Sequence, residues 1–172
     1  MGFGSPMGWV CIHLNPGAFM PAKKLKAFLD SQCVKYISLQ HSPAYTAPEV
    51  AESVHLSGHI LAKTVVLKVD GKMAMAVLPA NRKILVSDLC EGLEAESVRF
   101  ATEEELQGLF PDCEVGAMPP FGNLYGMDVY VSPGIAGEEQ IAFNAGTHTE
   151  VIKMAYRDFE RLVEPKVLIF TT

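Results

Sequence analysis

Lys63 is the first residue whose type and position suggest chemistry. It opens the apolar segment "KTVVLKV", and strand alternation gives it one face in common with three apolar residues, Val65, Leu67 and Val69. If that face is the core side, an ammonium group lies at the rim of an apolar cavity, where burial is costly unless an anion or polar ligand meets it. A lysine that snorkels from the end of a strand is the alternative, and the pattern favours neither.

A second feature is the loop "VGAMPPFGNLYG" at residues 115–126, which is rich in backbone constraints and poor in reactive side chains. Pro119 and Pro120 fix φ, whereas glycines permit conformations closed to other residues, here at Gly116, Gly122 and Gly126. Such a loop can present amides and carbonyls to a ligand as a rigid wall. It can equally be a stiff connector. No glycine-rich phosphate loop or dinucleotide fingerprint is present.

The loop "FNAGTHTE" at residues 143–150 contributes His148, the imidazole best placed to face a pocket. The alternative is an ordinary surface histidine. His55 and His59 have the spacing of helical metal ligands, but Ser57 and Gly58 between them should end a helix, and no third ligand lies near. We therefore expect neither a metal nor a cofactor.

Composition and charge narrow the class of protein. The chain has 172 residues, 49% hydrophobic and 20% charged, which suits one globular domain. A net charge of −6 disfavours indiscriminate nucleic-acid binding, so we expect no DNA partner and only local contact with RNA. Apolar runs are too short to span a bilayer, and four widely spaced cysteines suit a cytoplasmic protein with free thiols.

Several local signals predict the elements that position these residues. Capping boxes at Thr46 with Glu49 and at Thr102 with Glu105 predict two helix starts. Asp70-Gly71 between two apolar runs predicts a tight hairpin over residues 61–79. Strands are expected near residues 34–39, 97–100, 127–132, 140–144, 149–154 and 166–170, and further helices after Pro21 and at 87–93 and 156–163.

These elements predict an α+β fold: a mixed, mostly antiparallel sheet or distorted barrel flanked by helices. Strands outnumber helices and do not alternate with them regularly, which argues against a doubly wound parallel sheet. Residues 1–19 are expected to be an extension or a cloning remnant, and residues 20–172 the folded domain.

Taken in order, the motifs resemble the YbaK/prolyl-tRNA synthetase-associated domain family of aminoacyl-tRNA deacylases. The segments that carry the resemblance are "KTVVLKVDGKMAMAVLPANRKI", "EVGAMPPFG", "AFNAGTHTEVIKM" and "DFERLV". The combination of the lysine with the glycine-proline loop is specific for this family, although neither feature alone is.

The resemblance implies roles for individual residues. Lys63 takes the place of the family's essential lysine, which contacts the 3'-terminal nucleotide or the aminoacyl ester, and Gly116 is the first glycine of the loop whose backbone lines the site. His148 is implied less directly, because members differ in the third loop. The implied substrate-binding residues are Met118, Pro119, Pro120, Phe121, Gly122, Asn144 and Gly146, and the candidate walls that select the amino acid by size are Met75, Met118, Phe121 and Leu124.

An aminoacyl ester is already activated, so positioning and fixed oxyanion donors can supply much of the rate. The nucleophile is then a water or a group of the substrate. In this hypothesis the Lys63 ammonium faces the Gly116 turn, Lys63 anchors and polarises the ester, the Gly116 backbone orients it, and His148 tunes the water or the pocket. The function so implied is hydrolysis, in trans, of mischarged aminoacyl-tRNA of the Cys- or Ala- type, on tRNA-Pro. The partners are the aminoacyl-tRNA 3' end and, as a further candidate, a tRNA synthetase. The alternative is a non-catalytic module that binds a nucleotide, a tRNA end or a partner protein.

Overall fold

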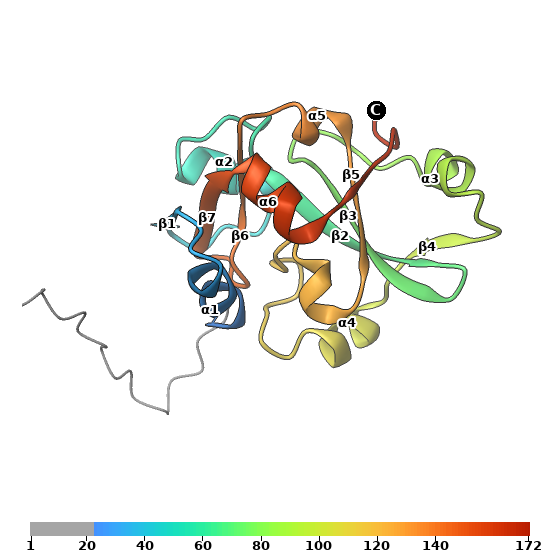
Figure 1. Cartoon of the computed structure of the whole chain (residues 1–172), viewed down its shortest axis with the longest axis horizontal. Coiled ribbons are helices and arrows are strands. Elements are labelled where there is room, and N and C mark those ends of the chain that lie inside the picture. Colours follow the sequence, from blue (N-terminus) through green and yellow to red (C-terminus); the bar gives the residue numbers. More distant parts are fainter. Residues whose placement is uncertain (1–22) are drawn as a thin grey trace, which may run out of the picture.

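The computed structural model describes residues 23–172, so the extension expected at residues 1–19 lies outside the described residues. The described chain contains six α-helices and eight strands (Figure 1). The helices are α1 (Lys23–Ser31), α2 (Ala47–Ser53), α3 (Val86–Leu93), α4 (Glu103–Leu109), α5 (Pro133–Ala136) and α6 (Tyr156–Val163). The strands are β1 (Tyr36–Gln40), β2 (Ala62–Val69), β3 (Lys72–Pro79), β4 (Val98–Phe100), β5 (Asp128–Val131), β6 (Gln140–Asn144), β7 (Glu150–Ala155) and β8 (Lys166–Val167).

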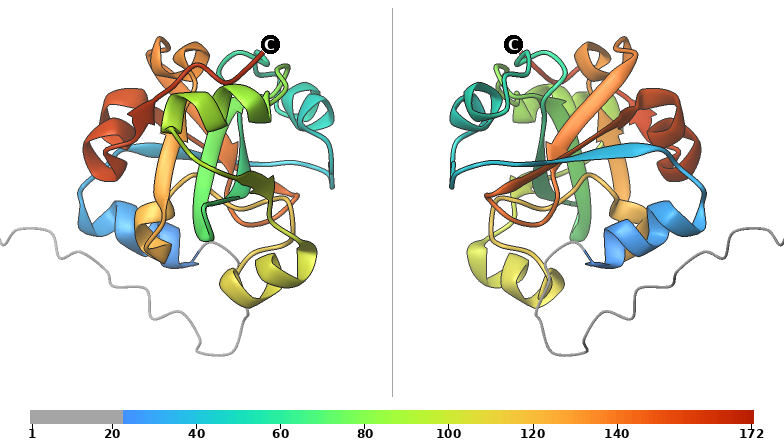
Figure 2. Two further views of the ribbon diagram at one scale, coloured as in Figure 1. Left: turned by 90° about the vertical axis from the view of Figure 1, so that its right-hand side faces the viewer. Right: turned by 90° about the vertical axis from the view of Figure 1, so that its left-hand side faces the viewer.

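The strands form two sheets, with the helices arranged around them (Figure 2). The first sheet has the order β1-β7-β6 and is antiparallel throughout. The second has the order β4-β2-β3-β5-β8, in which β5 pairs parallel with both β3 and β8. An isolated bridge from Leu61 to Ala142 links the two sheets just before β2 begins. The predicted α+β fold is confirmed; the sheets do not close into a barrel.

The hairpin of β2 and β3 is confirmed, and it sets the faces on which the candidate residues lie. Its turn residues Asp70 and Gly71 both have positive φ, 46° and 84°, as a tight hairpin of this type requires. Val66 is buried in the main core between the sheets, whereas Leu67 is buried in a second cluster on the opposite face of the strand. Consecutive residues of β2 therefore belong to different environments, which matters most at Lys63 and Thr64.

Both predicted capping boxes are present. The Thr46 side chain accepts from the Glu49 backbone at the start of α2, and Thr102 and Glu105 do the same at the start of α4. These boxes satisfy backbone N–H groups that a helix start leaves without partners. The cap on α2 matters for the site, because the chain just before it carries Tyr45 to the mouth of a cavity.

The structure corrects the expected last strand. Only Lys166 and Val167 pair, beside β5, instead of the whole segment 166–170. The chain then turns inward, because Phe170 is fully buried in the second core cluster and its carbonyl oxygen accepts from the Leu85 N–H. The four-residue helix α5 was not predicted, since one turn of helix leaves no periodic pattern. A 3-10 helix, Gly122–Tyr125, also lies inside the glycine-proline loop.

Candidate active site

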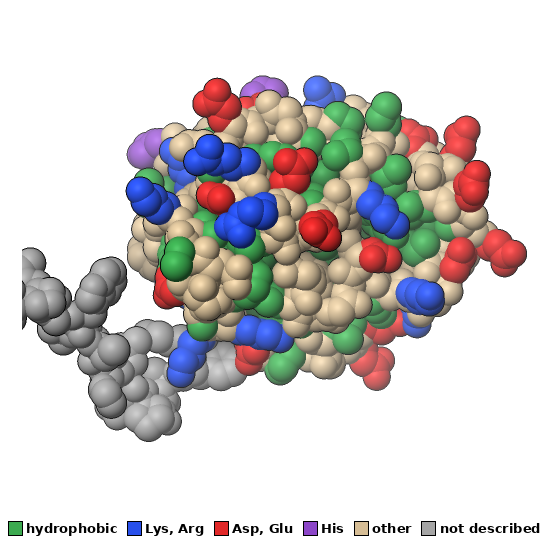
Figure 3. All heavy atoms as spheres, in the orientation of Figure 1, with side chains coloured by type: hydrophobic (Ala, Val, Ile, Leu, Met, Phe, Trp, Pro, Cys, Tyr) green, Lys and Arg blue, Asp and Glu red, His purple; other side chains and the backbone are tan. Residues whose placement is uncertain are grey.

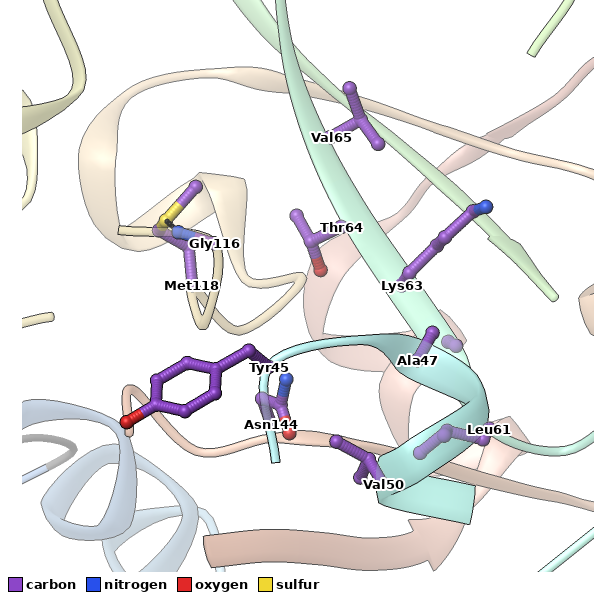
Figure 4. Close-up of a pocket in the computed structure, with 11 residues that line it drawn as sticks. Tyr45, Ala47, Val50, Leu61, Lys63, Thr64, Val65, Gly116, Met118 and Asn144 are labelled. Atoms are coloured by element: carbon purple, nitrogen blue, oxygen red, sulfur yellow. Dashed lines mark hydrogen bonds between the residues drawn. The ribbon is translucent and has the colours of Figure 1, made fainter. Parts of the chain in front are cut away.

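A small cavity of about 180 Å³ opens between the start of β2, the start of α2, the glycine-proline loop and the end of β6 (Figure 4). Segments far apart in the sequence meet here because the two sheets approach each other at the Leu61–Ala142 bridge. The residues that line it are Tyr45, Ala47, Val50, Leu61, Ala62, Lys63, Thr64, Val65, Gly116, Met118 and Asn144. None of these described residues is acidic, so any cationic group in the cavity would depend on neutral acceptors.

Lys63 lines this cavity, but the structure corrects the expectation that its amine faces the Gly116 turn. Figure 4 shows the Lys63 side chain leaving β2 on the side away from Gly116, whereas the next residue, Thr64, projects toward it. Lys63 is half-buried, and within residues 23–172 no carboxylate forms an ion pair with it. Burial, and to a smaller extent the charge of Lys83, lower the pKa of the Lys63 ammonium. An unpaired, partly desolvated cation of this kind attracts an anion.

The Gly116 turn depends on a glycine. Its φ is 87°, in the left-handed region that favours glycine. The Gly116 N–H donates to the Met118 Sδ atom, 3.3 Å away. A thioether sulfur is a weak acceptor, so a stronger acceptor on a ligand can take over this donor.

The loops that carry His148 and Gly116 lie side by side and are joined by hydrogen bonds. The Nε2 atom of His148 lies 2.9 Å from the Val115 carbonyl oxygen, and the His148 N–H donates to the Glu114 carboxylate at 2.7 Å. Two further backbone bonds join the loops, from Glu114 N–H to the Gly146 oxygen and from Gly146 N–H to the Ala117 oxygen, at 2.8 and 2.9 Å.

The His148 ring is absent from the cavity lining, which corrects the expectation that this imidazole faces the pocket. A carbonyl oxygen can only accept, so Nε2 is the donor in this hydrogen bond. Nδ1 is buried and has no hydrogen-bond partner in the described part of the chain. The exposed ring of Tyr45 packs against the imidazole, with ring centroids 4.9 Å apart. His148 is thus placed to hold the turn.

The remaining residues implied by the resemblance divide into two groups. Met118 and Asn144 line the cavity. Pro119, Pro120, Phe121 and Gly122 are buried and do not line it, and neither does Gly146, whose φ of 93° serves the turn after β6.

Core packing explains the positions of that second group. Phe121 packs against three other phenylalanines of the main core, Phe28, Phe143 and Phe159. A Cβ added at Gly122 would lie 2.6 Å from the Val129 side chain and 2.9 Å from the Met127 carbonyl oxygen. Among the candidate walls, Met75 and Leu124 also belong to that core. Met118 is the candidate wall that reaches the cavity.

Sequence reasoning missed two lining residues with polar groups, Tyr45 and Thr64. The strand alternation that placed Lys63 with Val65 also placed Thr64 on the opposite face, so the sequence predicted that Thr64 and Lys63 point in opposite directions. Nothing local showed that this face would meet the Gly116 turn. Tyr45 precedes a capping box, and only the packing of α2 reveals what its ring contacts.

Other chemistry finds little support in the described part of the chain. Residues 23–172 hold no cluster of three or more His, Cys, Asp or Glu side chains suited to a metal ion. Burial raises the pKa of the Cys113 thiol, the opposite of what an activated nucleophile needs. No helix among these residues is long and apolar enough to cross a membrane.

Comparison with known proteins identifies the relatives of this chain. The sequence pattern of the aminoacyl-tRNA editing domain matches residues 41–162. The chain is 23% identical over 144 residues to the prolyl-tRNA editing protein ProX of Acetoanaerobium sticklandii, covering 80% of this chain and 87% of that protein. It is 30% identical over 117 residues to the multifunctional Ser/Thr-tRNA deacylase ProXp-y of Escherichia coli K12, covering 63% of this chain and 68% of that protein.

The fold has a close counterpart among solved structures. A crystal structure described as that of a "putative trans-editing enzyme for prolyl tRNA synthetase" superposes with a TM-score of 0.77 at 18% identity, covering 92% of this chain and 99% of that one. The match over residues 41–162 establishes the class: the chain belongs to the aminoacyl-tRNA editing domain family. It is a hydrolase of the aminoacyl-tRNA deacylase type.

Proposed function

We propose that the protein hydrolyses, in trans, the ester bond of mischarged aminoacyl-tRNA that carries a small amino acid, of the Cys- or Ala- type, on tRNA-Pro. The observation that carries this proposal is the cavity of about 180 Å³ lined jointly by Lys63, Gly116 and Asn144. Drug-sized ligands occupy pockets of roughly 300 Å³ or more. This cavity suits a small aminoacyl group, and a larger side chain would clash with its walls. The related proteins differ in the amino acid that they are named for, so cavity size is the stronger argument.

In the proposed mechanism the Gly116 turn holds the ester. The Gly116 N–H, released from the Met118 sulfur, donates to the ester carbonyl and stabilises the oxyanion as it forms. Because the turn is tied to the 143–150 loop by four hydrogen bonds from His148, Glu114 and Gly146, this donor is fixed before the substrate arrives. Little reorganisation is then needed in the transition state.

Lys63 anchors the nucleotide end of the substrate in this proposal. Its amine leaves β2 on the side away from Gly116 and has no carboxylate partner among the described residues. That geometry favours attraction of an anionic group of the RNA over direct polarisation of the ester carbonyl. The described lining holds no carboxylate, imidazole or thiol to act as a general base. In this proposal the nucleophile is a positioned water, or a hydroxyl of the substrate assists the attack.

The test uses a panel of labelled aminoacyl-tRNAs, including Ala-, Cys-, Ser- and Pro-tRNA-Pro, with release of the amino acid as the measurement. The wild-type protein should release small amino acids and spare the prolyl ester, and Lys63→Ala should reduce kcat/KM by at least about 100-fold, as loss of a charged binding contact can. Lys72→Ala, an exposed lysine at the hairpin turn, is the matched control. Full activity of a folded Lys63→Ala variant would overturn the role of Lys63.

The same panel tests the alternative of a binding module. Saturable binding of tRNA with no release of any amino acid would contradict the hydrolase. A prolyl-tRNA synthetase is the synthetase partner to test first, because a relative of this fold is described as editing for that enzyme. A cytoplasmic location stays a prediction.

A further inference from the structure

Two polar groups in the cavity have no hydrogen-bond partner in the described chain. They are the Thr64 hydroxyl on β2 and the carboxamide oxygen of Asn144 at the end of β6, and both atoms are buried. A buried polar atom without a partner lowers stability, and native proteins contain few of them. Because both atoms belong to residues that line one cavity, a ligand with hydrogen-bond donors that enters it can satisfy them.

The two groups belong to different sheets and line the same cavity only in the folded chain. Figure 4 shows Thr64 projecting from β2 toward the side where Gly116, Met118 and Asn144 lie. Asn144 ends the strand that pairs with β7, and its side chain lies between Tyr45 and Val50 in the same view. The ester held at Gly116 therefore has Thr64 and Asn144 as polar neighbours, whereas the Lys63 amine lies on the other side of β2.

The chemistry of the lining indicates what these groups bind. Since none of the described lining residues is acidic, a hydrogen-bond donor that enters the cavity depends on neutral oxygen acceptors. The Thr64 hydroxyl oxygen and the Asn144 carboxamide oxygen are such acceptors. The donors on a small aminoacyl group are its α-ammonium and, in serine or threonine, the side-chain hydroxyl.

We propose that Thr64 and Asn144 form a subsite that accepts hydrogen bonds from a donor on the aminoacyl group, either the α-ammonium or a side-chain hydroxyl. This inference rests on the proposed function and names two specificity residues for it. A site built around hydrogen bonds to a substrate rejects analogues that lack the donor far more strongly than an apolar pocket rejects a changed methylene.

Thr64→Val is the decisive variant, because it removes the hydroxyl and keeps the β-branched shape. It should raise the melting temperature, since a buried hydroxyl without a partner is removed, and lower kcat/KM about tenfold, since one hydrogen bond to substrate is lost. Thr64→Ser restores the hydroxyl and should restore activity. A purely structural role predicts that activity and stability fall together.

Ser132→Ala is the matched control. The Ser132 hydroxyl is also fully buried without a partner in the described chain, but it lies outside the cavity. Its removal should likewise raise the melting temperature and leave kcat/KM unchanged. Comparison of Thr64→Val with Ser132→Ala therefore distinguishes the general effect of removing a buried hydroxyl without a partner from the effect of removing a hydroxyl that binds the substrate.

Three substrates identify the donor: alanyl-tRNA, seryl-tRNA and N-acetyl-alanyl-tRNA. If the donor is the α-ammonium, wild type favours alanyl- over N-acetyl-alanyl-tRNA, and Thr64→Val and Asn144→Ala abolish that preference. If it is the side-chain hydroxyl, both variants lose activity on seryl-tRNA and keep it on alanyl-tRNA. Equal activity of wild type and Thr64→Val on all three, or an equal loss on all three, overturns the subsite.

Failure of the proposed function would look different. Wild type would then release no amino acid from any substrate, and the subsite would be tested by binding alone. Calorimetric titration with a non-hydrolysable 3'-serylamido adenosine, which carries both candidate donors, should show about tenfold weaker binding to Thr64→Val than to wild type. N-acetylation of the ligand should remove this difference if the α-ammonium is the donor and leave it unchanged if the side-chain hydroxyl is the donor. Indistinguishable affinities of the two proteins for the serylamido ligand would remove the inference.

Discussion

The His148 imidazole donates a hydrogen bond to the carbonyl oxygen of Val115, 2.9 Å away, and so holds the peptide that immediately precedes Gly116. The bond joins two loops that are 33 residues apart in the chain. In our mechanism the orientation of the Gly116 N–H depends on this peptide, so His148 acts on catalysis through Gly116 as a positioning residue.

Replacing His148 with alanine should therefore lower kcat more than it raises KM. The hydrogen bond to Val115 and the contact with the Tyr45 ring are both lost, which should reduce stability by about 1 kcal/mol. The measurement is steady-state deacylation together with urea unfolding. His148→Gln, which can still donate to the Val115 oxygen, should recover part of kcat. If His148 were a general base, glutamine would recover none.

Gly116→Ala should reduce both stability and activity. At φ 87° an added Cβ is strained by about 1 kcal/mol, although the nearest contact it would make, to the His148 Cε1 atom at 3.6 Å, is an ordinary one. Gly126→Ala is the matched control, because Gly126 also has positive φ, 68°, and lies outside the cavity. We expect both variants to lower the melting temperature by a similar amount. Only Gly116→Ala should lose deacylation activity. Equal activity of the two variants would contradict a role for the Gly116 turn.

Gly122→Ala should be the most destabilising glycine substitution in this loop, by about 2 to 3 kcal/mol, because the new methyl meets the backbone oxygen of Met127 at 2.9 Å and the Val129 side chain at 2.6 Å. Chemical denaturation measures the loss. A variant as stable as wild type would show that the core around β5 repacks freely. The fraction that stays folded should remain active, since Gly122 does not line the cavity.

The pH dependence of substrate binding should reflect Lys63. Burial and, secondarily, Lys83 lower its pKa, so the ammonium loses its proton at a lower pH than a free lysine does. KM for aminoacyl-tRNA should rise as pH increases through that lowered pKa. Lys83→Gln removes the repulsive charge and should shift the rise to higher pH, as a KM profile between about pH 7 and 10.5 would show. An unchanged profile would contradict the coupling of the two lysines.

Stability should respond to the same lysine with a defined sign. The folded state releases the Lys63 proton at a lower pH than the unfolded state does, so the unfolded state binds more protons between the two pKa values. The free energy of unfolding therefore increases as pH rises through that interval. Below the pKa of Lys63 in the folded state, the charged lysine lowers the free energy of unfolding by its full amount. Lys63→Met should raise the melting temperature at pH 7. A lower melting temperature would mean that the ammonium has a stabilising partner in the folded protein.

Local sequence signals determined most of the secondary structure, and with the family resemblance they named four of the residues that line the cavity, Lys63, Gly116, Met118 and Asn144. The Asp70-Gly71 turn and the two threonine capping boxes depend on contacts within a few residues, so short stretches of sequence were sufficient to predict them. Strand alternation placed Lys63 and Thr64 on opposite faces for the same reason. The positive φ of Gly116 was expected because a glycine in a proline-rich loop readily adopts it. The family resemblance rests on those same segments.

Only the tertiary structure decided which of those groups meet. The bridge from Leu61 to Ala142 brings β2 to β6, and that approach places Thr64 and Asn144 in one cavity while Phe121, a neighbour of Met118 in the loop, is buried in the core. The direction of the Lys63 amine and the bond from His148 to Val115 depend equally on how two sheets and two loops pack. Alternation and turn chemistry act over a few residues, whereas these relationships join residues that are 33 (Val115 and His148) to 81 (Leu61 and Ala142) positions apart, which no local pattern in a single chain specifies.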